Sequence, residues 1–199
     1  MPLYPGTDPV TVVQCNDIPT HAYEELRVSF NTHAGTHIDA PSHMKIGAPS
    51  LSSIPIANFQ GKAYKVDLRH LTTDVITIDD LLPHQEAISK CEWVIVQTGW
   101  SQHWGSMHYF GPFPCLNEEA AKWLVQFPLK GIALDCISVD PCSSENYPIH
   151  HILFEKNMLI VENLKDLDQL DVDEFQFSCF PLNIRNADGS PIRGIAYVN

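Results

Sequence analysis

The stretch "FNTHAGTHIDAPSHM" (30–44) gathers three histidines and one aspartate into a short segment. If residues 32–39 form a strand, successive side chains alternate between its two faces, so His33, His37 and Asp39 point the same way. A helix would also bring the two histidines together, but Asp39 would face away from both, and the interior glycine would cost about 1 kcal/mol relative to alanine. The sequence therefore predicts a strand or twisted extended segment over 32–39, on which the three polar side chains converge.

Two imidazoles and one carboxylate on one face suit a divalent metal such as zinc, manganese or iron. Gly35 lies between the two histidines and leaves room for an ion or a close ligand. Pro41 cannot continue a central strand, so the chain turns there and presents His43 from a loop. The ten histidines of the chain could cluster by chance, but burying such polar groups without a partner is costly, which favours a metal site.

Candidates for the remaining ligands lie far along the chain. His150 and His151 follow Pro148 at the start of a predicted helix. Glu162 lies in the apolar run "MLIVENL" (158–164), where a carboxylate is costly unless it is paired or coordinated. A surface salt bridge is the alternative for Glu162, and spacing alone does not choose between His150 and His151.

The composition narrows the class of protein. A length of 199 residues with 44% hydrophobic residues predicts one globular domain with a substantial core. No apolar run is long enough to span a membrane, and the N-terminus lacks the basic and apolar regions of a signal peptide. A net charge of −12 argues against binding to nucleic acid or to an anionic membrane. The six cysteines are predicted to be buried thiols in a reducing cytoplasm, a local Cys136–Cys142 disulfide being the less favoured alternative.

A series of short apolar and β-branched runs predicts strands, and several are apolar throughout, as in strands covered on both faces. Helices are predicted at 116–127, with Asn117 as N-cap, and after Pro148. The expected fold is α/β, with a mixed β-sheet core and packed helices in one domain over residues 1–199. The runs are "VTVVQC" (10–15), "KAYKVDL" (62–68), "WVIVQT" (93–98), "GIALDC" (131–136), "MLIVENL" (158–164), "FQFSCFPLNI" (175–184) and "IRGIAYV" (192–198).

The segment "HAGTHIDAPSH" (33–43) matches every fixed position of the pattern His-x-Gly-Thr-His-x-Asp-x-Pro-x-His. By this pattern the chain resembles the cyclase-like metal-dependent hydrolase family, which includes bacterial kynurenine formamidases and isatin hydrolases. The resemblance continues through most of the chain. It includes "PLYPGTDP" (2–9), "VQTGW" (96–100), "ALDCISVDP" (133–141), "HHILFEKNMLIVENL" (150–164) and "DGSPIRGIAYV" (188–198).

The resemblance implies a fold and an assembly. Members have a single domain of the swivelling β/β/α type, usually as a homodimer or homotetramer. They usually begin with an extra strand, of the type Asp-Leu-Ser, before the Pro-Gly turn at residues 5–6. Here Met1 lies almost at that turn. Either the chain is a short variant or an upstream strand is missing. The expected sheet edge and oligomer contact depend on which of the two holds.

The resemblance also implies how the ligands are shared. His33, His37 and Asp39 would hold one ion, and Asp39 would bridge to a second. The second ion would be held by His150 and Glu162, because the interval between these two fits the family better than the interval from His151. Zinc is the expected metal and manganese the alternative, with one or two ions per chain. By the same resemblance, His43 would act as general base or acid.

The implied activity is hydrolysis of an amide or lactam C–N bond in a small molecule, most like an arylformamidase acting on an N-formylkynurenine-type substrate. The metal would activate a water molecule and polarise the carbonyl, while His43 moves the proton to the leaving nitrogen. The alternatives are a family member acting on a cyclic amide, imide or lactone, a non-catalytic metal- or ligand-binding protein on this scaffold, and an interaction protein in which the histidines are incidental.

The aromatic segment 98–114 is predicted to form a loop over the site, where Trp100 and Trp104 could stack on an aromatic substrate. The alternative is that these side chains pack the loop itself. Tyr4, near the N-terminal turn, is predicted to border the pocket.

Overall fold

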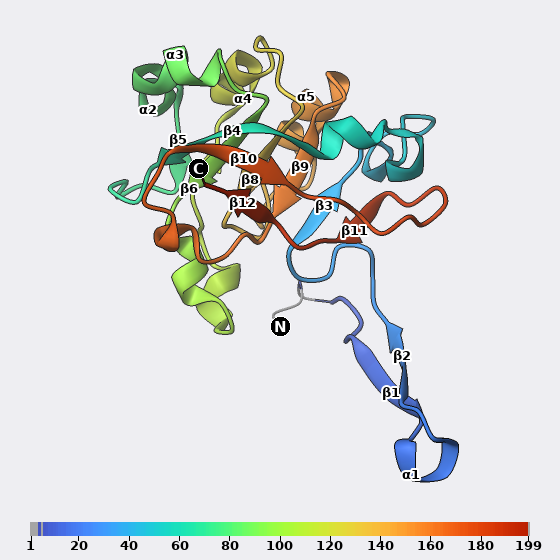
Figure 1. Cartoon of the computed structure of the whole chain (residues 1–199). Coiled ribbons are helices and arrows are strands. Elements are labelled where there is room, and N and C mark those ends of the chain that lie inside the picture. The colour runs from blue at the N-terminus through green and yellow to red at the C-terminus, as the bar shows by residue number, and fades with distance from the viewer. Residues whose placement is uncertain (1–3, 5, 199) are drawn as a thin grey trace.

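An eight-stranded mixed β-sheet forms the centre of the molecule (Figure 1). The computed structural model describes residue 4 and residues 6–198. The strand order is β11-β3-β9-β8-β6-β4-β10-β12, with parallel pairing among the four central strands and antiparallel pairing on both sides of them. These strands are β3 (His37–Asp39), β4 (Gln60–Asp67), β6 (Trp93–Gln97), β8 (Gly131–Leu134), β9 (Leu159–Glu162), β10 (Glu174–Ser178), β11 (Gly189–Pro191) and β12 (Ile195–Tyr197).

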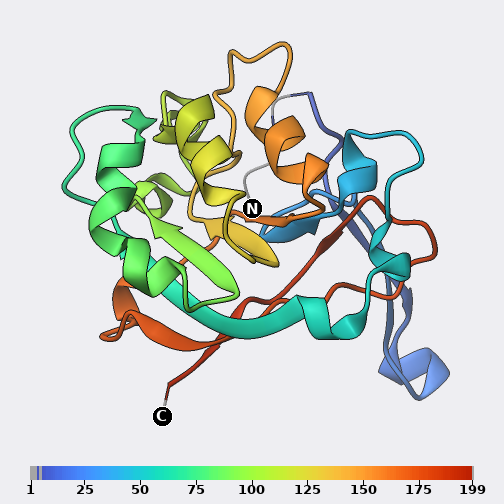
Figure 2. The same cartoon turned by 90° about the horizontal axis from the view of Figure 1, so that it is seen from above.

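Both faces of the central strands β6, β8 and β9 are buried, as their apolar sequences predict. In β6, Val94 and Val96 belong to the hydrophobic cluster under the helices, whereas Trp93 and Ile95 belong to the cluster on the opposite face. The sheet is curled, and the longer helices lie together on one side of it (Figure 2). On the other side Phe177 of β10 packs edge-on against Trp93, with ring centroids 5.4 Å apart. The predicted α/β fold with a mixed sheet is confirmed.

The two predicted helices are present. The predicted N-cap is observed at α4 (Glu118–Leu124), where the Asn117 side chain accepts a hydrogen bond from the Ala120 backbone N–H at 2.8 Å. Helix α5 (Pro148–Glu155) begins at its proline, which needs no N–H partner there. The other helices are α1 (Ile18–His21), α2 (Ile78–Leu81) and α3 (Gln85–Ile88). Short 3-10 helices cover Pro41–His43, Leu51–Ser53, Ile56–Phe59, Leu82–His84, Trp100–His103, Met107–Phe110 and Leu167–Gln169.

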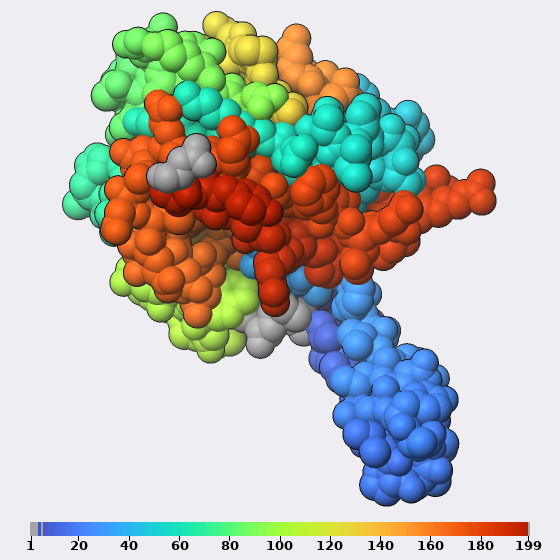
Figure 3. Space-filling model, viewed as in Figure 1, coloured from blue at the N-terminus to red at the C-terminus, as the bar shows by residue number. Residues whose placement is uncertain are grey.

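A two-stranded arm projects from the body of the molecule (Figures 1 and 3). It consists of β1 (Thr11–Asn16), the helix α1 at its tip, and β2 (Glu25–Ser29), with the two strands antiparallel. Nearly all of its residues are exposed. The run at 10–15 is therefore a strand, as predicted, but it lies outside the main sheet. A separate short parallel pair joins β5 (Val75–Ile76) to β7 (Cys115–Leu116).

Each of the predicted strand runs contains a strand, with shifted ends. The run at 175–184 ends as β10 at Ser178, after which the chain leaves the sheet. The expected strand over 32–39 is wrong for its first half, because only His37–Asp39 pairs as a strand. None of the helices in the described part of the chain has the length and apolar character needed to cross a membrane.

Candidate metal centre and active site

The centre of the site is formed by β3 and the neighbouring strand β9. His37 and Asp39 alternate onto the same face of β3, and His37 Nε2 lies 3.2 Å from Asp39 Oδ1. Glu162 stands opposite His37 in the antiparallel register, and its Oε2 lies 3.3 Å from His37 Nε2. All three side chains are buried. The alternation of side chains along β3, together with its pairing to β9, therefore explains how His37, Asp39 and Glu162 meet.

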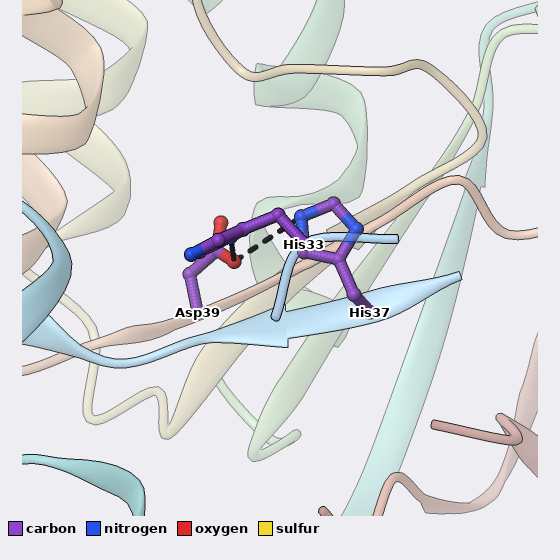
Figure 4. A group of neighbouring side chains, drawn as sticks. All are labelled: His33, His37 and Asp39. Atoms are coloured by element: carbon purple, nitrogen blue, oxygen red, sulfur yellow. Dashed lines mark ion pairs between the residues drawn. The ribbon is translucent and has the colours of Figure 1, made fainter. Parts of the chain in front are cut away.

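His33 reaches the same point from a turn and not from a strand. Its Nδ1 lies 2.7 Å from Asp39 Oδ1, the oxygen that His37 Nε2 also approaches (Figure 4). The turn depends on Gly35, whose φ of +70° lies in the left-handed region that favours glycine. The sequence assigned Gly35 the role of leaving space; its backbone conformation is the physical reason that the histidines converge.

His150 comes from the first turn of α5. Its Nε2 lies 3.5 Å from Glu162 Oε1, and its Nδ1 lies 2.6 Å from Asp140 Oδ2. Asp140 also accepts hydrogen bonds from the backbone N–H groups of Ile149 and His150, so it fixes both the helix start and the imidazole. His151 is exposed and belongs to the rim of the cavity. Of the two histidines that spacing left open, His150 is the one that joins the cluster.

The orientation of His37 is set by a chain of hydrogen bonds. Its Nδ1 lies 2.9 Å from the Gly35 carbonyl oxygen, which can only accept, so Nδ1 carries the proton and Nε2 faces the carboxylates. The side chain of Asn163 donates to the same carbonyl at 2.9 Å. The hydroxyl of buried Tyr109 donates to Asn163 Oδ1 at 2.7 Å. Tyr109 of the aromatic segment therefore holds Asn163, which in turn holds the Gly35 carbonyl that orients His37.

His43 lies at the end of the 3-10 helix that starts at Pro41, so it enters from a different direction, as the proline predicted. Its ring centroid lies 4.0 Å from that of His33 and 6.2 Å from that of His150. Burial lowers the pKa of His43, and the neighbouring charge of His33 lowers it further. A neutral imidazole at this place can accept a proton.

Opposite charges set the protonation of the rest of the cluster. Burial lowers the pKa of His33, but Asp39 outweighs burial and raises it to about 9. Burial also lowers the pKa of His150, but its hydrogen bonds to Asp140 and Glu162 raise it to about 9. Burial raises the pKa of the Asp39 carboxyl, yet the imidazoles beside it hold that pKa well below its usual range. Without a metal, the cluster is thus a set of buried ion pairs.

The donor set fits a divalent cation. Asp39 Oδ1 is buried and has no hydrogen-bond partner among the described residues, although imidazole nitrogens approach it from two sides. A buried carboxylate is costly unless a cation sits beside it; the protonated imidazoles supply that charge in the metal-free chain, and a bound divalent ion would replace their protons. Two overlapping groups have donor atoms within 4.8 Å of one another and share Asp39: His33, His37, Asp39 and Asp39, His150, Glu162. These are the two ligand sets that the family pattern implied.

The cluster opens into a cavity of about 580 Å³, a usual size for a small-molecule site. Tyr4 lines this cavity, as predicted. Neither Trp100 nor Trp104 is among the described residues that line it, so their predicted place in the pocket is not observed. Trp100 Nε1 donates to the Tyr109 carbonyl at 2.9 Å, and Trp104 packs edge-on against the Tyr109 ring. The alternative reading, that these side chains pack their own loop, is the one that the structure shows.

Comparison with known proteins places this arrangement in a family. A family model described as "Putative cyclase" matches residues 1–141. The chain belongs to this family. The kynurenine formamidase of Bacillus cytotoxicus is 29% identical over 193 residues, which is 96% of this chain and 89% of the relative.

Solved structures of similar fold agree with this assignment. Isatin hydrolase A from Labrenzia aggregata, bound to benzyl benzoate, superposes with a TM-score of 0.85 at 23% identity, over 98% of this chain and 87% of that one. A potential metal-dependent hydrolase with cyclase activity gives a TM-score of 0.77 at 27% identity, over 98% and 90%. The family predicted from "HAGTHIDAPSH" is confirmed, and the predicted amide hydrolase agrees with the kynurenine formamidase relatives.

Four residues of the site in this cyclase-family chain escaped the sequence reasoning: Tyr109, Asp140, Asn163 and Asp188. Asp140 ends an apolar strand-and-turn segment just before a proline, and an aspartate placed shortly before a candidate histidine helix was an available signal. Asp188 precedes a glycine in a polar turn, which offers no local signal. Tyr109 and Asn163 look like core and turn residues, so only the three-dimensional structure relates them to the site.

Proposed function

We propose that this chain is a metal-dependent hydrolase that cleaves the amide C–N bond of a small molecule, most like an arylformamidase acting on an N-formylkynurenine-type substrate. One observation carries the proposal. The buried oxygen Asp39 Oδ1, without a hydrogen-bond partner in the described chain, lies between two histidines at the floor of an open cavity. Curated relatives of nearly full length are kynurenine formamidases.

We propose zinc as the metal, with manganese as the alternative, held as one or two ions. The first ion would be held by His33, His37 and Asp39, and the second by Asp39, His150 and Glu162. Nitrogen and carboxylate donors of this kind suit either metal. A divalent ion bound there supplies Lewis acidity, which activates water at neutral pH and polarises a carbonyl group.

His43 is the proton carrier in this proposal. Its Nδ1 lies 3.2 Å from Asp188 Oδ2, which leaves Nε2 as the nitrogen that is free toward the cavity. The lowered pKa of His43 keeps this nitrogen unprotonated near neutral pH. His43 therefore takes a proton at Nε2 and returns it to the leaving nitrogen of the amide.

The walls of the cavity support an aromatic substrate. Apolar and aromatic side chains surround the polar floor: Tyr4, Met44, Ile137, Pro141 and Tyr147. A mostly apolar wall with a few polar groups at one end suits a flat ring that carries an amide. The size of the cavity leaves room for either a formyl-anilide or a fused lactam such as isatin, so both belong in the test.

The experiment compares wild-type protein with His37→Ala and with the control His70→Ala, in which the exchanged histidine is exposed and outside the cavity. Metal content is measured by elemental analysis without added metal. Hydrolysis of formyl-anilides, isatin, cyclic imides and lactams is then assayed with zinc and with manganese. The proposal expects metal and turnover in wild type and control, and neither in His37→Ala. Metal without turnover on the whole panel would establish a binding protein instead, and absence of metal would refute both.

We further propose that two copies associate through the arm. On one face of the arm, Val12, Val28 and Leu26 stand together without cover from any other element of the described chain. An isolated two-stranded ribbon is marginal in water, so this face needs a partner. The arm is acidic at Asp17, Glu24 and Glu25.

A second copy offers a complementary surface. Phe180, Leu182 and Ile184 are exposed before β11, with Pro181 and Asn183 between them, and Arg185 adds a positive charge. Directly after this segment, the Asn186 N–H donates to Ser52 Oγ in the 3-10 helix Leu51–Ser53. Because every copy carries both arm and receiving surface, a two-fold symmetric dimer can satisfy both at once. A homotetramer would repeat this contact.

We also propose a cytoplasmic location and no nucleic-acid or membrane partner. All six cysteines are free thiols in the structure, which suits a reducing compartment, but the prediction that all are buried is wrong, because Cys15 is exposed and Cys142 is half-buried. The net charge of −12 disfavours polyanionic partners.

A further inference from the structure

We propose that Asp188 is a positioning residue that fixes the orientation and the tautomer of two imidazoles at once, those of His43 and His33. This inference rests on the proposed function, because His43 is the proton carrier and His33 a metal ligand in it. Asp188 lies in the turn before β11, far in sequence from both histidines.

One carboxylate oxygen serves both rings. Asp188 Oδ2 lies 3.0 Å from His33 Nε2 and 3.2 Å from His43 Nδ1. The other oxygen, Oδ1, accepts a hydrogen bond from the Thr32 hydroxyl at 3.0 Å. The carboxylate therefore stands between the two histidines and is tied by a third contact to the chain that carries His33.

The chemistry of these contacts assigns the protons. An ionised carboxylate can only accept, so His33 Nε2 and His43 Nδ1 must each carry a hydrogen. When His33 is neutral, as a metal ligand must be, each of the two imidazoles has one N–H, which leaves the lone pair on His33 Nδ1 and on His43 Nε2. His33 Nδ1 is the atom that faces Asp39, and His43 Nε2 is the atom left for proton transfer. One side chain thus aims both a ligand lone pair and a basic lone pair into the site.

The backbone holds Asp188 in place for this task. Its carbonyl accepts a hydrogen bond from the Ala40 N–H at 2.8 Å, and the next residue, Gly189, pairs with Asp39 at the sheet edge. A side chain at position 189 would bring its Cβ to 2.6 Å from His33 Cε1, so the glycine lets the ring stack against the strand. The carboxylate is therefore presented by the same strand pair that presents Asp39.

Asp188 itself could be thought a metal ligand, since its oxygen and nitrogens of His33 and His43 lie within 4.8 Å of one another. Two observations argue for positioning instead. The Asp188 carboxylate is held by three polar contacts, to His33, His43 and Thr32, and it lies outside the two donor groups that share Asp39. The side chain of Asp188 is also 40% exposed, whereas that of Asp39 is 1% exposed.

The first test needs no substrate. Nitrogen-15 spectra of wild-type, zinc-loaded protein report which ring nitrogen of each histidine carries the proton, with the signals assigned by comparison with His43→Gln and His33→Gln. The expected result is His43 protonated at Nδ1 and His33 at Nε2. If either proton is found on the other nitrogen, the inference is overturned. Because no turnover is measured, this outcome is independent of the proposed function.

The second test compares Asp188→Asn with the control Asp79→Asn, an exposed aspartate outside the cavity. On a substrate that the wild type hydrolyses, Asp188→Asn should lower kcat roughly 10- to 100-fold, the usual effect of losing such a partner. KM should stay within about threefold, because the substrate contacts are unchanged. Metal content per chain should equal that of the wild type.

Two results would contradict the inference here. Wild-type kcat in Asp188→Asn would show that the carboxylate orients nothing that matters to turnover. A loss of metal that excess zinc does not restore would show that Asp188 is a ligand, because loss of a positioning partner weakens metal binding only about 10- to 100-fold. If the wild type itself hydrolyses nothing on the panel, the proposed function has failed, and the tautomer measurement still decides the role of Asp188.

Discussion

His37 and Glu162 face each other directly across the antiparallel pair of β3 and β9, with His37 Nε2 3.3 Å from Glu162 Oε2. A shift of one residue in this register would turn one of the two side chains to the other face of the sheet. The strand pairing itself therefore sets the distance between a ligand of the first set and a ligand of the second. Several expected outcomes depend on this relationship and on its neighbours.

Replacement Glu162→Gln should weaken metal binding while leaving the fold intact. The amide has nearly the shape of the carboxylate but no charge, so His37 and His150 lose their common negative partner. We expect metal affinity to fall at least about tenfold, measured by competition with a chromophoric chelator. Glu174→Gln, which removes an exposed carboxylate paired with Lys62, is the control. Equal affinities in the two variants would contradict the assignment of Glu162.

Replacement His43→Gln should separate catalysis from metal binding. His43 belongs to neither of the two groups that share Asp39, so metal content should stay at the wild-type value. The loss of a proton carrier should reduce kcat by roughly 10²- to 10⁴-fold. Steady-state kinetics and elemental analysis on the same preparation check both statements. A variant with wild-type turnover would exclude His43 as the acid or base.

The metal-free protein should lose stability as the pH rises from 6.5 to about 9. The pKa of His33 and that of His150 are both raised from 6.5 to about 9 in the folded chain. In this window the folded state holds protons that the unfolded state has released, so the free energy of unfolding falls with rising pH. Thermal melting of chelator-treated protein should show a Tm lower by roughly 3 °C or more at the upper end.

Metal binding should follow the opposite trend over the same window. A metal must displace the protons on His33 and His150, so its affinity should increase with pH, and binding should release protons. A pH indicator in weakly buffered solution measures this release when zinc is added. Zinc uptake without proton release at pH 7 would show that these histidines are not the ligands.

Replacement Gly35→Ala should disturb the site more than its cost in stability suggests. Alanine at a φ of +70° costs about 1–2 kcal/mol, and relaxation of the turn would move His33 away from Asp39. Gly105→Ala is the matched control, since Gly105 also has a positive φ, of +89°, and nothing within 4 Å of an added Cβ. Both variants should lose similar stability in denaturant titrations. Only Gly35→Ala should lose metal, and equal metal contents would refute the role of the turn.

The dimer proposal predicts a difference between the two faces of the arm. Val12→Lys places a charge on the apolar face beside Val28, whereas Val13→Lys places it on the opposite face beside Arg27. Light scattering coupled to size exclusion should give a monomer, or a weakened dimer, for Val12→Lys and a dimer for wild type and Val13→Lys. A wild-type monomer at micromolar concentration would contradict the proposal.

The sequence predicted those parts of the site that local periodicity controls. His37 and Asp39 share a face because strands alternate, and Pro41 redirects His43 because it ends the strand. His33 was correctly predicted to join the site, but for the wrong reason. A turn at Gly35, which has a left-handed backbone conformation, brings it there, and not a strand. The family pattern supplied the pairing with His150 and Glu162, which spacing alone left open.

Contacts between distant segments could not be predicted. Asp188 meets His33 and His43 only because β11 pairs with β3, and no local pattern encodes that register. Trp100 and Trp104 are aromatic residues in a loop, a composition shared by substrate lids and by self-packed loops. The arm was missed because β2 is short and mixed in polarity, and because an apolar face that no other described element covers has no sequence signature.

The short pairing of β11 with β3 has a consequence for how the chain reaches its native state. The two strands are separated by most of the sequence, and each contributes only three residues to the ladder. Closing so long a loop costs conformational entropy, and the few hydrogen bonds that form do not offset this cost early in folding. The parallel centre of the sheet is therefore expected to form first, and this edge to close last. The histidines on and before β3 and the carboxylate before β11 then meet only when folding is almost complete, so the proposed metal would bind after the rest of the chain has folded.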